Sequence, residues 1–276
     1  MNGLWRASRL NASGTDGRET PPLPAVALAI VAGSFFVLPV VGLVFRAPWS
    51  VVWHELTSAE IHTALRLSLV SSLAATVLSV VLGVPLAWVN ARVAYRGRRV
   101  VRALTTLPMV LPPVVGGVAL LLVFGRRGLL GQWLDRGLGV RLPFTTAGAV
   151  LAETFVAMPF FILTVEAGLR SVDQRLEEAA RTLGARRWAV FWHVTLPLIR
   201  PSLVAGAVLT WARALGEFGA TITFAGNFPG RTQTMPLAVY AALESRPEAA
   251  IVLSLVLLGV SLAVLVSLRE QWLGAK

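Results

Sequence analysis

The chain has 276 residues, of which 55% are hydrophobic and 14% are charged, and it contains no cysteine. This composition excludes a disulfide framework and a thiolate metal site, and the 3 histidines are too scattered to predict a metal site. The formal net charge of +11 would suit a nucleic-acid-binding protein, but most basic residues flank apolar runs. Because runs of about 20 apolar residues cross a ~30 Å hydrocarbon core, the sequence predicts a protein of the lipid bilayer with no nucleic-acid partner.

Six apolar segments predict an all-α integral membrane protein with six transmembrane helices. The predicted spans are residues 24–45, 67–89, 103–124, 145–169, 202–224 and 249–268. The polar segment 1–23, with its Gly, Ser, Thr and Pro residues, is expected to be a disordered cytoplasmic tail.

The distribution of Lys and Arg predicts the orientation of these spans. With six spans, 16 of the 25 basic residues fall in segments on the side of both termini, and 7 fall in the loops on the other side. Cytoplasmic segments carry the excess of Lys and Arg, so both termini are expected in the cytoplasm. The loop 125–144, with 4 arginines on the predicted outside, does not fit this rule.

Pro108, Pro112 and Pro113, followed by Gly116 and Gly117, interrupt the third predicted span. Each proline removes a backbone donor, and the glycine pair permits the close approach of another helix. We therefore expect this helix to be broken or strongly bent, where neighbouring helices or a water-filled cavity satisfy the freed backbone groups.

A polar, Arg-rich stretch at residues 171–201 separates the fourth and fifth spans. Ser171, with a glutamine three residues later, makes a capping-box pattern that predicts a helix from Val172. Gly184 is suited to end that helix in a left-handed turn, and a second short helix is expected over residues 186–195. The stretch is therefore predicted to form a helical hairpin outside the bilayer.

The hairpin sequence contains Glu178-Ala179-Ala180, then Gly184 after three residues, and Leu196-Pro197 near its end. In these residues and their spacing it is similar to the EAA loop of ABC-importer permease subunits. Only Val194 departs from the family's pattern, which more often has isoleucine there. The resemblance implies a cytoplasmic coupling hairpin that binds a separate ATPase subunit. The residues at the positions of this pattern, which are expected to couple to the ATPase, are Glu178, Ala179, Ala180, Gly184, Val194, Leu196 and Pro197. The residues alone also allow an amphipathic hairpin that joins two membrane helices and has no partner.

The fifth span places Arg213 and Glu217 near mid-membrane, where charges are costly and mark candidate functional sites. The two residues are four positions apart, so we expect an ion pair within one helix. Ala212, Gly216 and Ala220 repeat at the same spacing, as in helices that pack closely. Either this helix lines a translocation path, or the ion pair only holds the bundle together.

Together, the candidate residues for the pathway or for helix packing in this span are Arg213, Gly216, Glu217, Gly219 and Thr221. Thr221 is expected to offer a hydrogen-bond donor to an anionic cargo.

Residues 60–268 resemble permeases of the molybdate/sulfate family of type I ABC importers, and molybdate permeases more closely than sulfate permeases. The resemblance rests on the coupling loop, on the LP…LPP run of the third span and on residues 214–234. It implies the type I permease fold and a homodimer in the cytoplasmic membrane. It also implies two ATPase subunits and an extracytoplasmic oxyanion-binding protein as partners. The implied activity is ATP-driven import of molybdate, with sulfate, thiosulfate or tungstate as alternatives.

The sequence lacks a GxxxxGK[ST] phosphate loop and any recognisable catalytic grouping, so the chain is not expected to be an enzyme. No cofactor is expected in this chain, and ATP and Mg are expected on the ATPase partner. A rival of a different class is an ion-coupled secondary transporter, which predicts inverted repeats and acidic residues in discontinuous helices. Glu153, Glu166 and Glu217 leave that alternative open.

Overall fold

The computed structural model describes residues 22–273, and this part of the chain forms helices and connecting turns without a β-strand. Residues 1–21 of the expected tail lie outside the described residues. The first helix, α1 (Leu23–Phe45), is a continuous helix of 23 residues without a charged side chain, and it belongs to a unit of its own. The residues from Ala47 onward form a second unit, which contains all the candidate site residues.

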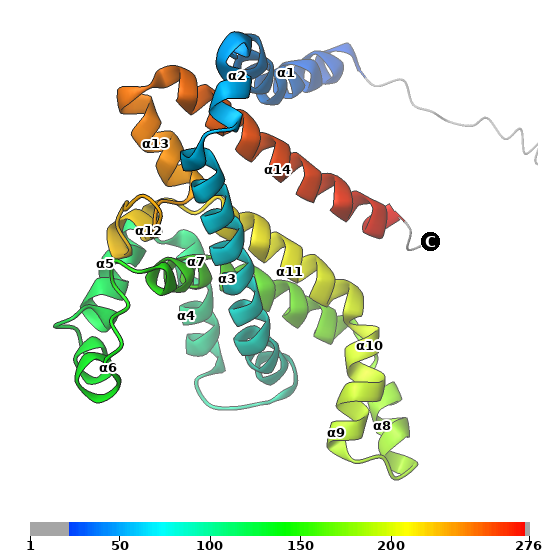
Figure 1. The fold of residues 1–276 in the computed structure, drawn as a ribbon. Helices are drawn as coiled ribbons and strands as arrows, with labels where there is room; N and C mark the ends of the chain where they lie inside the picture. Colours follow the sequence, from blue (N-terminus) through cyan, green and yellow to red (C-terminus); the bar gives the residue numbers. More distant parts are fainter. Residues whose placement is uncertain (1–21, 274–276) are drawn as a thin grey trace, which may run out of the picture. The chain divides into compact units, whose positions relative to one another are not determined.

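Four helices in the described part are long and apolar enough to cross a membrane. They are α1, α3 (Ala59–Arg92), α7 (Thr146–Ser171) and the first part of α14 (Pro247–Leu273), up to Val264. A fifth candidate is the bent pair formed by residues 187–198 and the helix α11 (Arg200–Leu215), which meet at 69°. The remaining helices from Ala47 onward are shorter (Figure 1): α2 (Trp49–Leu56), α4 (Arg98–Val110), α5 (Pro113–Phe124), α6 (Gly131–Leu138), α8 (Gln174–Thr182), α9 (Arg187–Val190), the π-helical turn η1 (Phe191–Thr195), α10 (Leu196–Leu198), α12 (Gly219–Phe224) and α13 (Met235–Ser245).

The helices α3, α7 and α11 form the centre of the second unit, with α7 in contact with both of the others. Phe161 of α7 is fully buried between two glycines. A Cβ atom on Gly83 of α3 would lie 2.6 Å from the Phe161 ring, and one on Gly206 of α11 would lie 3.2 Å from it. Inside a bilayer the hydrophobic effect does not drive helices together, so close van der Waals packing at small residues stabilises the contacts between them. This explains why the centre of the bundle combines glycine with a large aromatic side chain.

Hydroxyl side chains line the buried face of α3. Ser68, Ser71, Ser72, Thr76 and Ser79 recur at helical spacing and are all buried. Ser79 donates a hydrogen bond to the carbonyl oxygen of Ala75 in its own helix (2.7 Å), and Trp211 of α11 donates its indole N–H to Ser72 (2.9 Å). Short hydroxyl side chains therefore let α3 approach α7 and α11 while keeping their own polar groups satisfied.

The third predicted span is broken, as its prolines indicate. The helix α4 ends at Val110, and α5 begins at Pro113 after two extended residues. Pro112 and Pro113 lie at this break, whereas Pro108 lies within α4. Neither segment is long enough to span a bilayer as a helix by itself, because about 20 residues are needed.

The expectation of one continuous helix over residues 202–224 is wrong. The helix α11 ends at Leu215, and the chain turns through residues 216–218 before α12 begins at Gly219. The two broken segments pack against each other, since a Cβ on Gly219 would lie 2.8 Å from Pro113 Cβ, and one on Gly117 would lie 2.6 Å from Thr223 Cβ. The glycines therefore allow α5 and α12 to pack in direct backbone contact.

Candidate functional site

The predicted helical hairpin is present, and it lies at the end of α11 (Figure 1). Its first helix, α8, begins at Gln174 instead of Val172, and Asp173 caps it by accepting the N–H of Arg175 (3.0 Å). Ser171 does not cap α8, because its hydroxyl donates to the carbonyl oxygen of Gly168 at the end of α7 (2.8 Å). The capping-box assignment is therefore wrong, and the cap lies two residues later.

Gly184 ends the first helix in a left-handed conformation, with φ of 86°, as predicted. The second helix is more irregular than expected: α9 is followed by a π-helical turn, in which the N–H of Leu196 donates to the carbonyl oxygen of Phe191. A π-helical turn shifts the hydrogen-bond register by one residue, and α10, which contains Pro197, follows directly. The chain then bends by 69° into α11.

Glu177 anchors the hairpin to the bundle. Its side chain is 8% exposed and pairs with Arg92 at the end of α3, with 3.0 Å between Oε1 and the guanidinium nitrogen. The hydroxyl of Thr195, in the second half of the hairpin, donates to the same oxygen (3.0 Å), and Arg181 lies 3.9 Å from the other oxygen. One buried carboxylate thus links α8, η1 and α3.

Sequence reasoning missed Glu177, which directly precedes the matched Glu178. The only available signal was its spacing of four from Arg181 within a helix with one buried face. By contrast, Glu178 and Ala179 are exposed, as are Gly184 and Pro197, whereas Ala180, Val194 and Leu196 are partly buried.

Large apolar side chains cover the outer surface of the hairpin. Leu183 is 89% exposed, Trp188 74% and Trp192 56%. Several exposed apolar side chains on a segment rich in charged residues are typical of a protein–protein contact surface. The hairpin is therefore held to the bundle on one side and exposes apolar side chains on the other, as expected of a segment that binds another protein.

A substitution at Gly184 tests the shape of this element. A Cβ at Gly184 would meet no other atom within 4 Å, so Gly184→Val adds no clash, but it places a β-branched residue at positive φ. We expect the turn between the two helices to change; if the hairpin couples to an ATPase, as its resemblance to the EAA loop implies, transport should fall strongly while ATP hydrolysis continues. Gly97→Val is the matched control, because Gly97 also has positive φ (87°) and open space around it but lies outside the hairpin. If Gly184→Val and Gly97→Val transported the same amount of cargo per ATP hydrolysed, this role of the turn would be contradicted.

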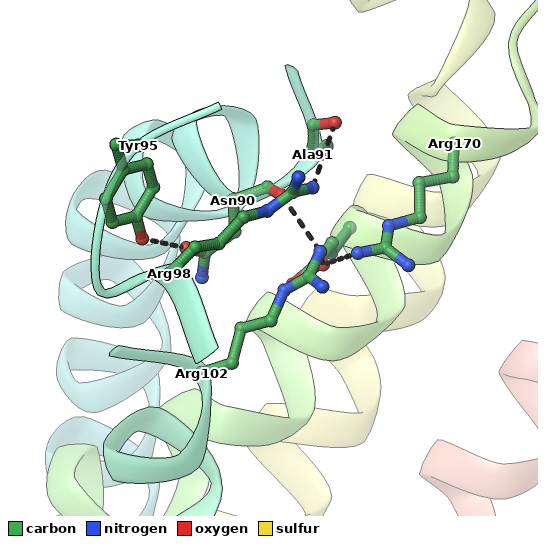
Figure 2. Close-up of polar contacts among 7 residues, drawn as sticks. Asn90, Ala91, Tyr95, Arg98, Arg102 and Arg170 are labelled. Atoms are coloured by element: carbon green, nitrogen blue, oxygen red, sulfur yellow. Dashed lines mark hydrogen bonds and ion pairs between the residues drawn. The ribbon is translucent and has the colours of Figure 1, made fainter. Parts of the chain in front are cut away.

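A second cluster of charges lies where α3, α4 and α7 meet at the same end of the bundle (Figure 2). Glu166 of α7 accepts hydrogen bonds at Oε1 from Arg102 and from Arg170 (2.6 Å to Arg170). Arg102 also donates to the carbonyl oxygen of Asn90 (2.9 Å), and Arg98 donates to the same carbonyl. These arginines satisfy carbonyl groups that the end of α3 leaves without helical partners.

The predicted ion pair between Arg213 and Glu217 is confirmed, with 2.6 Å between the guanidinium nitrogen and Oε2. The expectation that both residues lie in one helix is wrong, because Glu217 lies in the turn between α11 and α12. Its other oxygen accepts the N–H of Ala220 (2.8 Å) and so satisfies a free donor in the first turn of α12. Glu217 therefore joins the two halves of the broken segment.

Thr221 is less accessible than expected, and Ala212 and Gly216 are less tightly packed than expected. Thr221 is fully buried, so its hydroxyl does not reach an anion in this conformation. Ala212 and Gly216 are exposed, and a Cβ on Gly216 would meet only the carbonyl oxygen of Ala212 at 3.8 Å. The small-residue stripe is therefore packed within this chain only at Ala220, and its other two positions are free to contact something else.

Glu153 is a further buried carboxylate of the bundle. It is 1% exposed and accepts a hydrogen bond from Ser71 of α3 (2.8 Å), while Oε2 has no partner among the described residues. Its contact joins α7 to the hydroxyl-lined face of α3. This placement on a well-packed helix pair favours a structural role for Glu153.

The four arginines of the predicted outer loop are partly neutralised within the loop. Asp135 of α6 pairs with Arg141 at 2.8 Å and with Arg126 at 3.5 Å. The hydrogen bond from Arg141 contributes most to lowering the pKa of Asp135 below its usual value. Asp135 compensates one of the four positive charges, but the orientation rule counts Lys and Arg and not net charge, so this loop still does not fit it.

This set of broken apolar helices with a projecting helical hairpin is the fold of an importer permease. It matches a crystal structure of a bacterial alginate ABC transporter in complex with a periplasmic protein bound to an alginate pentasaccharide, with a TM-score of 0.73 and 18% sequence identity. The match covers 90% of this chain and 92% of the solved chain. At this identity the likeness establishes the fold alone.

The sequence comparisons define the family. The family model for the inner membrane component of binding-protein-dependent transport systems matches residues 79–274. The molybdenum transport system permease protein ModB of Mycobacterium tuberculosis H37Rv is 47% identical over 89% of this chain and 93% of its own length. The sulfate transport system permease protein CysT of Escherichia coli K12 is 35% identical over 90% of this chain and 92% of its own length. The chain belongs to the family of inner membrane components of binding-protein-dependent transport systems, and is a permease of the type I ABC-importer class.

Proposed function

We propose that this permease translocates molybdate into the cytoplasm as part of an ATP-driven importer. The observation that supports the cargo is the 47% identity to a molybdenum transport permease over nearly the whole chain. The observation that supports ATP-driven transport is the exposed hairpin, which is held to the bundle by the buried Glu177. Sulfate is the second candidate cargo, because this chain is 35% identical to a sulfate transport permease. Thiosulfate and tungstate are related alternatives.

The proposed topology has six membrane crossings with both termini in the cytoplasm. Four crossings are the long apolar helices. The other two are proposed to be the broken segments α4–α5 and α11–α12, with residues 187–198 placed outside the bilayer as part of the hairpin. Broken helices are tolerated at membrane depth where protein or a water-filled cavity satisfies the backbone, and such places line translocation paths. The orientation follows from the excess of Lys and Arg on the side of the hairpin.

Three kinds of partner complete the proposed importer, and all reside at or in the cytoplasmic membrane. Two ATPase subunits bind the hairpins through Glu178, Leu183 and Trp188, and they hold the ATP and Mg, so this chain needs no cofactor. A second copy of the chain packs on the exposed Ala212 and Gly216. An extracytoplasmic oxyanion-binding protein delivers the cargo.

The pathway is proposed to run along the broken segments, where Arg213, Gly216 and Gly219 lie. Glu217 compensates the charge of Arg213, so a dianion meets a nearly neutral surface and is not held tightly. A pore that bound its ion strongly could not release it, so selection is expected to reside mainly in the binding protein.

A competition experiment tests the cargo. The assembled importer, with its binding protein and ATPase, takes up labelled molybdate in the presence of an excess of unlabelled sulfate, tungstate or molybdate. We expect tungstate and molybdate to compete far better than sulfate. Equal competition by sulfate would transfer the assignment to sulfate import.

A further inference from the structure

The charge cluster at the inner end of the bundle contains more cations than it neutralises. Arg98, Arg102 and Arg170 converge on the region beside Asn90 (Figure 2). Glu166 is the only carboxylate among the described residues within ion-pair distance of these three arginines. One carboxylate compensates one charge, so two positive charges of the cluster are left uncompensated, on side chains that are only partly buried: Arg102 is 32% exposed and Arg170 is 47% exposed.

Several hydrogen-bond donors of the cluster are also unused. Within residues 22–273, the buried Nε atoms of Arg98 and Arg102 have no hydrogen-bond partner. The side chain of Asn90 is fully buried and accepts the Tyr95 hydroxyl at Oδ1 (2.7 Å), while its Nδ2 has no partner. Buried polar groups without partners are rare, and a group of them at one place indicates a missing acceptor.

A cavity of about 240 Å³ opens beside Asn90 and Arg102, whereas Arg98 does not line it. Arg102, Arg170, Glu166 and Asn90 form its polar end, and Ile162 and Leu163 of α7 form an apolar wall. The volume is several times the roughly 30 Å³ that one water molecule occupies in the liquid. It therefore has room for a phosphate-sized group as well as part of an apolar chain.

We propose that this cavity, the inner pocket, binds a tetrahedral oxyanion, which is either the phosphate of an anionic lipid or a free oxyanion that leaves the translocation path. Guanidinium groups offer forked donors that match such oxygens, and basic pockets between membrane helices on the cytoplasmic side suit anionic lipid headgroups. Two arginines and one glutamate line the pocket, so its lining carries one net positive charge, which the phosphodiester of a lipid or a free oxyanion compensates. The lipid source stands independently, and the free-oxyanion source rests on the proposed function.

Arg170→Gln is the most direct variant, because Arg170 is 47% exposed and its one ion pair is with Glu166 at i,i+4 spacing. The matched control is Arg181→Gln, since Arg181 is 51% exposed and also pairs with a buried glutamate at i,i+4 spacing, but lies outside the pocket. Leu163→Trp is a second variant, which fills the apolar wall and keeps every charge. The three variants are prepared as full-length chains in detergent and compared with the wild type by gel filtration and melting temperature.

Two probes distinguish the two sources. Calorimetric titration measures molybdate binding to the full chain without lipid, and native mass spectrometry measures retained phosphatidylglycerol against phosphatidylcholine. We expect at least one probe to bind the wild type and the Arg181→Gln variant equally. Loss of one charged hydrogen bond weakens binding roughly tenfold or more, and we expect a loss of this size for Arg170→Gln. We expect a similar loss for Leu163→Trp, because its larger side chain fills the pocket.

Binding of molybdate identifies a free oxyanion as the ligand, and selective retention of phosphatidylglycerol identifies a lipid phosphate. If neither probe binds, or if Arg181→Gln weakens binding as much as Arg170→Gln, the inner pocket is not an oxyanion site. Uptake of molybdate by the assembled importer in that case would leave the proposed function intact, so the two failures are distinguishable.

Discussion

Replacing Glu177 with glutamine is expected to uncouple ATP hydrolysis from transport. The substitution removes the charge that compensates Arg92, and Arg92 is 8% exposed, so a buried cation is left alone at the end of α3. Breaking a buried ion pair in this way costs roughly 3–5 kcal/mol. The hairpin also loses its charged link to the end of α3, so we expect a change at the hairpin to be transmitted less to α3.

Two measurements check this prediction. The melting temperature of the full chain should fall in Glu177→Gln and stay close to the wild-type value in Glu178→Gln, because Glu178 is exposed. In the assembled importer, the ratio of molybdate transported to ATP hydrolysed should fall at least about tenfold in Glu177→Gln, and partly recover in the double variant with Arg92→Met. Equal melting temperatures and a wild-type ratio in Glu177→Gln would contradict the anchoring role.

In the broken fifth segment, we expect loss of Arg213 to destabilise the protein more than loss of the Glu217 charge. Glu217 is 1% exposed and Arg213 is 29% exposed, so removing the arginine leaves the more deeply buried charge alone. We expect Arg213→Met to cost roughly 3–5 kcal/mol of stability and Glu217→Gln to cost less, because Arg213 is less deeply buried within the chain and the glutamine oxygen can still accept the Ala220 N–H.

The double variant, Arg213→Met with Glu217→Gln, should be more stable than Arg213→Met alone, because no uncompensated charge remains. Melting temperatures of all four proteins, together with their transport rates, give the coupling energy of the pair. If the two single effects simply add, the pair is not coupled, and one of the charges contacts another helix or the cargo directly.

Local backbone chemistry was the most predictable part of this structure. Pro112 and Pro113 predicted the break between α4 and α5, because proline cannot donate to the helix ladder. Gly184 predicted the left-handed turn of the hairpin for an equally local reason. The pairing of Arg213 with Glu217 followed from two charges at close spacing in an apolar segment.

Features that depend on tertiary contacts were not predictable in the same way. The break at residues 216–218 has no proline, and it is stabilised by the side chain of Glu217 and by the packing of Gly219 on Pro113. Ser171 matched a capping pattern, yet its hydroxyl bonds to the preceding helix, and Asp173 takes its place. Glu177 gains its role from Arg92, which is 85 residues away in the sequence.

Transport by the purified permease in liposomes tests directly whether import is driven by ATP. The binding protein is added on the side of the vesicle membrane to which the extracytoplasmic face of the permease is turned. One set of vesicles contains the ATPase subunits and ATP, and a second set contains the permease alone with an imposed proton or sodium gradient. We expect molybdate uptake in the first set and none in the second. Uptake driven by an ion gradient without the ATPase would contradict this expectation, and would establish a secondary transporter instead.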